Sequence, residues 1–163
     1  MADKYINDIV MSNAELIMPF RNFQGKETDY NPAGRRNFCV FIPEDIEEQL
    51  KADGWNVKHT RPRDPDEAPR PYLQVAVSYE NYPPKVYTLA GNRKTLLDDK
   101  SIGELDHAEI ESVDLIIRPY QWSTHTGSGV KAYLKTMYVT IKPDPFAGKY
   151  DRYEEDVDQD IPF

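Results

Sequence analysis

The sequence has very little cysteine and no long apolar stretch. Its single cysteine, Cys39, has no partner for an intramolecular disulfide and sits in the apolar run 38–42, which predicts a small buried side chain. The absence of a signal peptide and of any apolar run of about 18 residues argues against a membrane span and predicts a cytoplasmic protein. A body of about 150 residues is large enough to bury a core without a metal or a disulfide.

Patterns typical of catalysis or of metal binding are also scarce. His59, His107 and His125 lie far apart, and no Cys-x-x-Cys or His-x-x-x-His spacing is present. The segments 91–95 and 127–129 contain glycines but lack the frame of a phosphate-binding loop. We therefore expect a protein that is not an enzyme, with no metal site and no cofactor.

Acidic residues outnumber basic ones, but the excess of acids is spread unevenly along the chain. The net charge is −8, and the segment Asp151–Phe163, with six acids and one base, accounts for most of it. That segment has too few apolar residues to offset its ordering entropy, which predicts a disordered acidic tail at 151–163 after one folded domain at 1–150. The nearly neutral domain can still carry a basic groove if its acids lie elsewhere.

Alternating apolar residues predict several β-strands. The strongest patterns cover residues 111–122 and 130–141 and are joined by a connection that ends in Gly-Ser-Gly, a hairpin signal. Weaker patterns predict strands at 14–20, 35–42, 55–58, 72–79 and 85–90, the first two of them as an antiparallel hairpin.

One segment has a good helix pattern, and the other connections read as loops. Pro43–Asp53 begins with a proline and several acids, and Gly54 follows it. Residues 60–71 are a proline-rich loop, and residues 92–107 are polar with at most one short helical turn. This arrangement favours an all-β fold with one or two short helices, namely a small antiparallel β-barrel of the oligonucleotide/oligosaccharide-binding (OB) type with long loops. An open sandwich fits the pattern almost as well.

Aromatic residues are plentiful, and many lie beside a base. The chain has 11 Tyr, 6 Phe and 2 Trp. Single-stranded nucleic acid is bound by exposed rings that stack on bases and by cations that neutralise phosphates. Strand alternation predicts such a face, made by Arg118, Tyr120 and Trp122 on one strand and by Lys131, Tyr133 and Lys135 on the next.

In the second of these strands, the alternation places apolar residues on the same face as the predicted contacts. Met137 and Val139 share the parity of Lys131, so the assignment requires a β-bulge or a twist within the strand. The alternative is that the rings cap the core and that the cations are simply solvated. The full set of candidate nucleic-acid contacts is Arg35, Arg36, Lys85, Tyr87, Arg118, Tyr120, Trp122, Lys131, Tyr133 and Lys135.

Two parts of the chain resemble known proteins. The last four residues, Asp160-Ile-Pro-Phe163, resemble the acidic tip with which bacterial single-stranded-DNA-binding proteins dock on partner proteins. The domain is similar to the single-stranded-DNA-binding proteins of tailed bacteriophages. The segments that carry this similarity are Asn31–Phe38, Ala52–Lys58, Val113–Trp122 and Gly129–Tyr138.

The resemblance implies a non-catalytic OB-fold protein that binds single-stranded DNA during phage replication or recombination, in the host cytoplasm. It also implies that replication or recombination proteins dock on Asp158, Asp160, Ile161, Pro162 and Phe163. Homo-oligomerisation is left open. The alternative hypothesis is an OB-type protein-interaction module whose acidic tail mimics nucleic acid.

Overall fold

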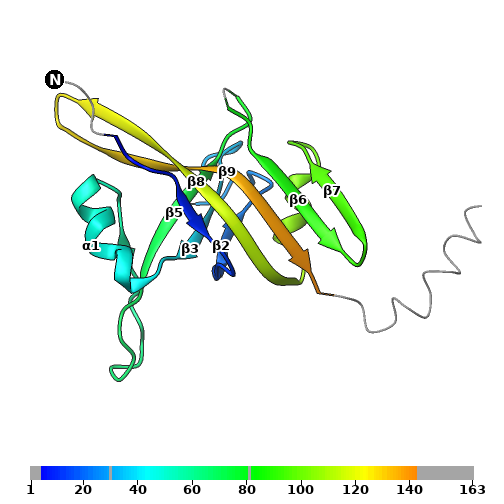
Figure 1. Cartoon of the computed structure of the whole chain (residues 1–163), viewed down its shortest axis with the longest axis horizontal. Helices are drawn as coiled ribbons and strands as arrows, with labels where there is room; N and C mark the ends of the chain where they lie inside the picture. Colours follow the sequence, from blue (N-terminus) through cyan, green and yellow to red (C-terminus); the bar gives the residue numbers. More distant parts are fainter. Residues whose placement is uncertain (1–4, 30, 81, 143–163) are drawn as a thin grey trace, which may run out of the picture.

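The part of the chain that the structure describes forms a single mixed β-sheet with one α-helix at its side. The computed structural model describes residues 5–29, 31–80 and 82–142. In chain order (Figure 1), the elements are β1 (Ile9–Met11), β2 (Leu16–Asn22), β3 (Arg36–Phe41), α1 (Glu44–Asp53), β4 (Lys58–His59), β5 (Pro71–Val77), β6 (Lys85–Ala90), β7 (Arg93–Leu97), the 3-10 helix η1 (Ile102–Asp106), β8 (Ile110–Thr124) and β9 (Gly127–Ile141).

The strands follow the order β1-β8-β9-β5-β3-β2, with β4 added beside β5 and the β6–β7 hairpin beside β9. All pairings between the described strands are antiparallel except those of β9 with β5 and with β6, which are parallel. The two edge strands of the main path, β1 and β2, are consecutive in the chain. No pairing joins β1 to β2 among the described residues, so the curled sheet is not closed into a barrel, and the expected β-rich, OB-like fold is confirmed in this open form.

The core lies on the inner face of the curled sheet. Alternation is regular in β5, where Leu73, Val75 and Val77 are buried and the residues between them are more exposed. η1 lies across one end of this core and contributes Ile102 and Leu105, both fully buried. The buried apolar residues form one contiguous core.

Strand β9 contains a β-bulge at Lys135. Ile116 of β8 pairs with Thr136, but Ile117 pairs with Leu134, so Lys135 is one residue more than β8 can match. Leu134 and Met137 are consequently both buried, although their spacing is odd. This confirms the bulge that the sequence required and keeps the outer face of β9 polar and aromatic along its length.

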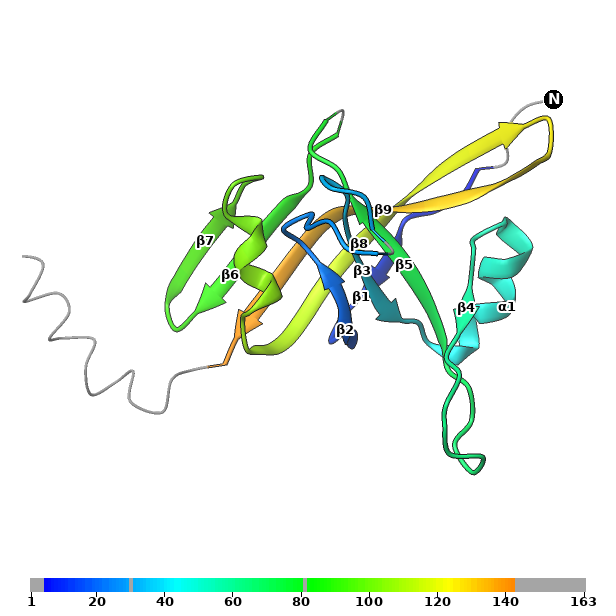
Figure 2. The same ribbon diagram turned by 180° about the vertical axis from the view of Figure 1, so that it is seen from behind.

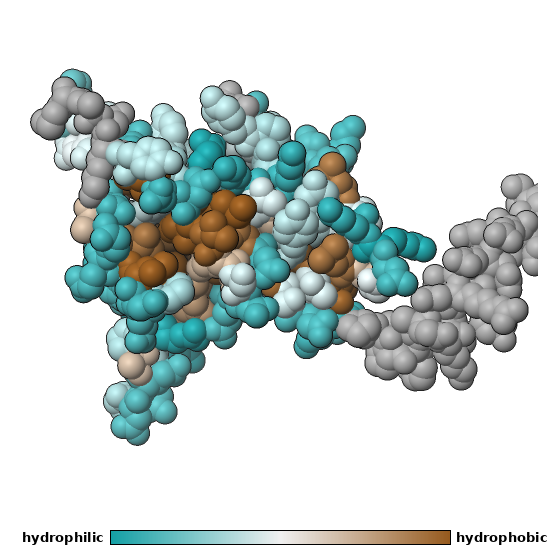
Figure 3. All heavy atoms as spheres, viewed as in Figure 1, coloured by the Kyte–Doolittle hydropathy of each residue, from teal (hydrophilic) through white to brown (hydrophobic). Residues whose placement is uncertain are grey.

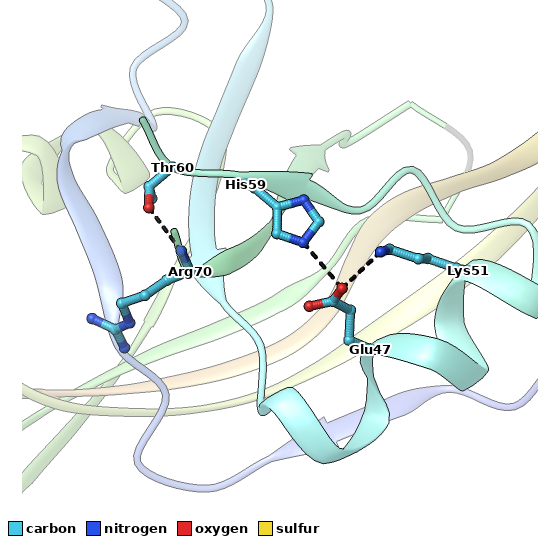
Figure 4. A network of polar contacts seen from close by, with 5 residues as sticks. All are labelled: Glu47, Lys51, His59, Thr60 and Arg70. Atoms are coloured by element: carbon cyan, nitrogen blue, oxygen red, sulfur yellow. Dashed lines mark hydrogen bonds and ion pairs between the residues drawn. The ribbon is translucent and has the colours of Figure 1, made fainter. Parts of the chain in front are cut away.

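The helix α1 begins at Glu44, one residue after the predicted start at Pro43, and ends before Gly54, as predicted. Gly54 has φ of 101°, a left-handed conformation that glycine adopts without strain, and its N–H caps the helix. Glu47 in α1 accepts hydrogen bonds from Lys51 Nζ at 2.7 Å and from His59 Nε2 at 3.0 Å, which holds β4 against the helix (Figure 4). Both contacts lower the pKa of Glu47, and the hydrogen bond from Lys51 has the larger effect.

The hairpin of β2 and β3 is anchored to η1. Asp106 accepts hydrogen bonds from the backbone N–H groups of Phe23 and Gln24, at 2.7 and 3.0 Å. The Arg21 guanidinium donates to the carbonyl of Leu105 at 2.8 Å, and the ring of Phe23 stacks on Phe38 in the core. These contacts fix the tip of the hairpin, from which the two predicted arginines project.

The elements differ from the sequence prediction in several places. Residues 93–97, expected to be polar loop, form β7, and the strand expected at 55–58 is reduced to β4 at 58–59. β1 was not expected. Loop 60–70 connects β4 to β5, in agreement with the prediction.

Candidate functional site

A groove of about 1110 Å³ opens where four parts of the chain meet. Its walls are the start of β3, the segment after α1, the outer side of β5, and the long hairpin of β8 and β9, which we call the arm. Figure 2 shows the arm reaching beyond the rest of the sheet, above α1. The arm is attached beside α1, because Val130 N–H donates to the carbonyl of Gly54 at 2.9 Å.

The arm supplies an aromatic wall. Trp122 and Tyr120 are 41% and 51% exposed, so these rings do not belong to the core. Trp122 pairs with Gly129 across the hairpin, and a Cβ added at Gly129 would lie only 3.1 Å from the indole. The indole therefore rests against the backbone of the neighbouring strand, a position that the missing side chain of Gly129 makes available.

Cations lie next to these rings. The Tyr120 and Tyr133 rings meet edge to face with centroids 5.9 Å apart, and Lys131 Nζ lies 5.1 Å from the centroid of the Tyr133 ring. The Arg118 guanidinium lies 5.5 Å from the Tyr133 centroid and 4.8 Å from that of Tyr82, in the connection between β5 and β6. The arm thus brings together Arg118, Tyr120, Lys131 and Tyr133, all four of them predicted contacts. Trp122, a fifth, lines the same groove as Lys131 and Tyr133.

The opposite wall carries the two arginines of the first hairpin. Arg35 is exposed, while Arg36 is half-buried and donates from Nη2 to the carbonyl of Asp99 at 2.9 Å. The Arg36 guanidinium also lies 5.5 Å from the centroid of Tyr79. Burial raises the pKa of Tyr79 to about 12, so its hydroxyl stays protonated and neutral under ordinary conditions. Arg36 is thereby fixed in place, whereas Arg35 is free to reach a ligand.

The floor of the groove contains hydrogen-bonding groups that the sequence did not single out. Trp55 is 4% exposed and packs beside Val130, and its Nε1 has no hydrogen-bond partner among the described residues. Arg36 Nε and Tyr79 Oη, which belong to groove-lining residues, are likewise buried without a partner there. Gln74 and Asn37 add side-chain amides, and the acids Glu80 and Asp99 also line the groove.

Five predicted contacts do not line the groove itself. Two of them, Arg118 and Tyr120, lie beside it in contact with Tyr133, and the other three lie elsewhere. Lys85 and Tyr87 are on β6, and the ring of Tyr87 stacks on Tyr138 of β9 with centroids 5.1 Å apart. Lys135, in the bulge, forms an ion pair with Asp8 at 2.8 Å. The predicted tail residues Asp158, Asp160, Ile161, Pro162 and Phe163 lie outside the described part of the chain.

The other groups that carry chemistry do not converge. In residues 5–29, 31–80 and 82–142, no three His, Cys, Asp or Glu side chains are close enough to hold a metal ion. Burial raises the pKa of the Cys39 thiol, which disfavours the reactive thiolate. Within the same residues, no helix has the length and apolar character needed to cross a membrane.

The sequence prediction missed Trp55, which lines the groove, and Tyr82, which lies beside the arm, for identifiable reasons. Trp55 follows a helix and was expected in a strand, so nothing local indicated that it would lie beneath the arm. Tyr82 directly precedes the pair Pro83-Pro84 and belongs to no alternating pattern, but its ring meets Arg118, which is remote in sequence. The adjacency of a lone aromatic to a proline pair was the only local signal, and it is typical of turns rather than binding sites.

Comparisons with known proteins bear on the fold and on the family of the chain. No curated protein sequence matches the chain. Among solved structures, it resembles the single-stranded DNA-binding protein from bacteriophage Enc34 in complex with ssDNA, with a TM-score of 0.52, 17% identity, and coverage of 85% of this chain and 89% of the other. A C-terminal truncation of the Enc34 protein gives a TM-score of 0.53 at 17% identity, covering 85% and 88% of the two chains.

These structural matches support the fold, and a family model gives the membership. The model of the phage ssDNA-binding domain matches residues 1–162, which is nearly the whole chain. Proteins of this kind bind DNA without catalysis, which confirms the expectation that the chain is not an enzyme. The chain belongs to the family of phage ssDNA-binding domains.

Proposed function

We propose that the chain binds single-stranded DNA in the groove between the arm and the first hairpin. The observation that carries the proposal is the aromatic wall made by the exposed Tyr120 and Trp122 and the half-buried Tyr133, with Lys131 and Arg118 beside the rings. Unpaired bases stack on such rings for about 1–3 kcal/mol each, and the cations neutralise the phosphates between them. Arg35 on the opposite wall completes the clamp around the strand.

The biological role follows from the family and the acidic segment together. The chain coats single-stranded DNA exposed during phage replication or recombination, and residues 151–163 recruit the proteins that act on that DNA. The tip Ile161–Phe163 supplies an apolar anchor, and the acids before it steer the encounter with a basic partner surface.

A fluorescence titration with oligo-dT tests the DNA-binding proposal. Trp122 is exposed in the groove and Trp55 is buried, so stacking of thymines should quench mainly Trp122. The variant Trp122→Phe keeps a ring for stacking but removes the reporter, and we expect nearly unchanged binding by anisotropy with most of the quench lost. A duplex of the same length should bind much more weakly, because its bases are already stacked. Equal affinity for duplex and single strand would contradict the proposal.

The salt dependence of the same titration separates phosphate contacts from stacking. Lys131→Ala should reduce the slope of log K against log salt by about 0.7, the value for one phosphate on a single strand. Arg63→Ala removes an equal charge from loop 60–70, outside the groove, and should leave the slope unchanged. No binding at any salt concentration would favour the alternative of a protein-interaction module.

A further inference from the structure

A second group of rings and cations lies on the same outer face of β9 as the groove. Tyr138 of β9 stacks on Tyr87 of β6, with ring centroids 5.1 Å apart and ring planes 13° apart. Lys94 of β7 places its Nζ 4.5 Å from the Tyr87 centroid and 5.4 Å from the Tyr138 centroid. We call Tyr87, Lys94 and Tyr138 the distal cluster.

The bulge is the reason that the distal cluster and the groove share a face. Tyr133 pairs with Arg118, and Tyr138 pairs with Asp114, on the same side of β8. Without the extra residue Lys135, the odd spacing of Tyr133 and Tyr138 would place them on opposite faces. The distance along β9 between these two rings is roughly 15 Å at about 3.3 Å per residue.

Cations occupy the interval between the two aromatic groups. Lys85 of β6 pairs with Thr136 of β9, next to Lys135 in the bulge. Neither Lys85 nor Lys94 forms an ion pair with another described residue, whereas Lys135 is paired with Asp8. The face thus alternates rings, cations and rings from Trp122 to Tyr138, which matches the alternation of bases and phosphates in a single strand.

Two acids near the distal cluster and the bulge are already engaged. Asp8 is bound by Lys135 at 2.8 Å, and Asp114 accepts the backbone N–H of Asn13 at 2.9 Å. Figure 3 shows hydrophobic residues over the β6–β7 hairpin as well as around β1 and β8. Leu96 of β7, opposite Tyr87, is 60% exposed and enlarges the apolar surface beside the rings.

We propose that the distal cluster is a second subsite for single-stranded DNA, occupied by nucleotides that continue from the groove across Lys85 and Lys135. The proposal rests on the proposed function, because the strand must first occupy the groove. A base stacks on the exposed part of the Tyr87–Tyr138 pair, and Lys94 binds an adjacent phosphate. Long oligonucleotides therefore reach both subsites, and short ones fill only the groove.

The test is a length series of oligo-dT, from about 4 to about 20 nucleotides, which covers the range of site sizes known for one OB fold. The wild-type affinity should rise with length until both subsites are filled. Tyr138→Ala should leave the shortest oligonucleotides bound as before and weaken the long ones by roughly 5- to 100-fold, the range expected for one lost stack. Tyr138→Phe keeps the ring and should bind like the wild type.

A second pair of variants avoids any question of folding. Lys94 and Arg93 are adjacent, exposed and equally charged, but alternation along β7 turns them to opposite faces. Lys94→Ala should lower the salt slope on long oligonucleotides by about 0.7, and Arg93→Ala should not change it.

The outcomes separate the two proposals. Unchanged length dependence in both Tyr138→Ala and Lys94→Ala overturns the distal subsite while leaving the groove intact. An equal loss at all lengths also overturns it, because the cluster would then act only through the structure of the groove. If the wild type binds no oligonucleotide of any length, the proposed function itself fails.

Discussion

At the scale of single residues, a glycine sets the position of the most exposed tryptophan. The indole of Trp122 lies over Gly129, where an added Cβ would approach three indole atoms to 3.1–3.2 Å. Such contacts are closer than packed carbon atoms tolerate, which is about 3.5–4.0 Å. An alanine at this position therefore requires the indole to shift by a few tenths of an ångström away from the neighbouring strand.

We predict that Gly129→Ala weakens binding to oligo-dT, by up to the value of one stacked base, about 1–3 kcal/mol. The control is Gly127→Ala in the same hairpin, because a Cβ at Gly127 meets no atom within 4 Å. Thermal unfolding should be nearly the same for the two variants, since Trp122 is exposed. Equal DNA affinity for the two variants would show that the position of the indole is unimportant.

At the scale of elements, the bulge allows one strand to serve both the core and the face on which we propose that DNA binds. Ala132 and Leu134 precede it and Met137 and Val139 follow it, and all of them are buried. A regular strand of this sequence would bury one group and expose the other, since alternation has a period of two. The extra residue, Lys135, resolves the conflict at the cost of a single unmatched position.

We predict that deleting Lys135 destabilises the protein far more than replacing it. Lys135→Ala removes only the partly exposed ion pair with Asp8, whose value is about 0–1 kcal/mol. Deletion shifts the alternation of β9 by one residue, so either Leu134 or the pair Met137 and Val139 would turn to solvent. Burial of each such side chain contributes about 1.5–3 kcal/mol to the free energy of unfolding. Chemical denaturation of both variants measures the difference. Similar free energies of unfolding would mean that β9 can slip in register without loss.

The sequence was sufficient to predict elements whose alternation is strong. β8, β9 and α1 were found close to their true bounds, and the conflict of parity in β9 correctly pointed to a bulge. β7 was missed because four of its five residues are exposed, so no alternation is visible, and only its pairing with β6 makes it a strand. β1 was missed because it has only three residues and is defined by a partner late in the chain.

The site was predictable to the extent that it lies on one hairpin. Tyr120, Trp122, Lys131 and Tyr133 share a face because of strand alternation, which can be read locally. Trp55, Tyr82, Tyr138 and Lys94 join the surface through contacts between distant segments, and no local pattern indicates such contacts.

At the scale of the whole molecule, the negative net charge does not prevent a basic surface. The acids of the first turn of α1, Glu44, Asp45 and Glu47, do not line the groove. The cations of the groove and of the distal cluster therefore act locally, within a screening distance of about 8–10 Å at ordinary salt. Binding should depend on these few contacts rather than on long-range attraction.

We predict that removing residues 151–163 tightens the binding of single-stranded DNA at low salt. The segment carries six acids, and its attachment to the domain gives it a high effective concentration as a competitor for the cationic groove. The gain should shrink at high salt because screening weakens the competition. Oligo-dT titrations of the full and truncated chains at two salt concentrations measure the effect.

A point variant separates competition from recruitment. Phe163→Ala keeps every charge of the segment, so DNA affinity should stay unchanged while binding to a replication protein of the same phage is lost. Weaker DNA binding by the truncated chain would mean that residues 151–163 contribute to the DNA site or to the fold.

The pairing of the first strand with a late one also has a consequence during synthesis. Ile9 pairs with Ile117, so β1 leaves the ribosome long before its partner strand exists. At about 5–20 residues per second, the intervening hundred or so residues take roughly 5–20 s to translate. The beginning of the nascent chain must remain unpaired through this interval, and the sheet can curl into its final form only when the arm has emerged.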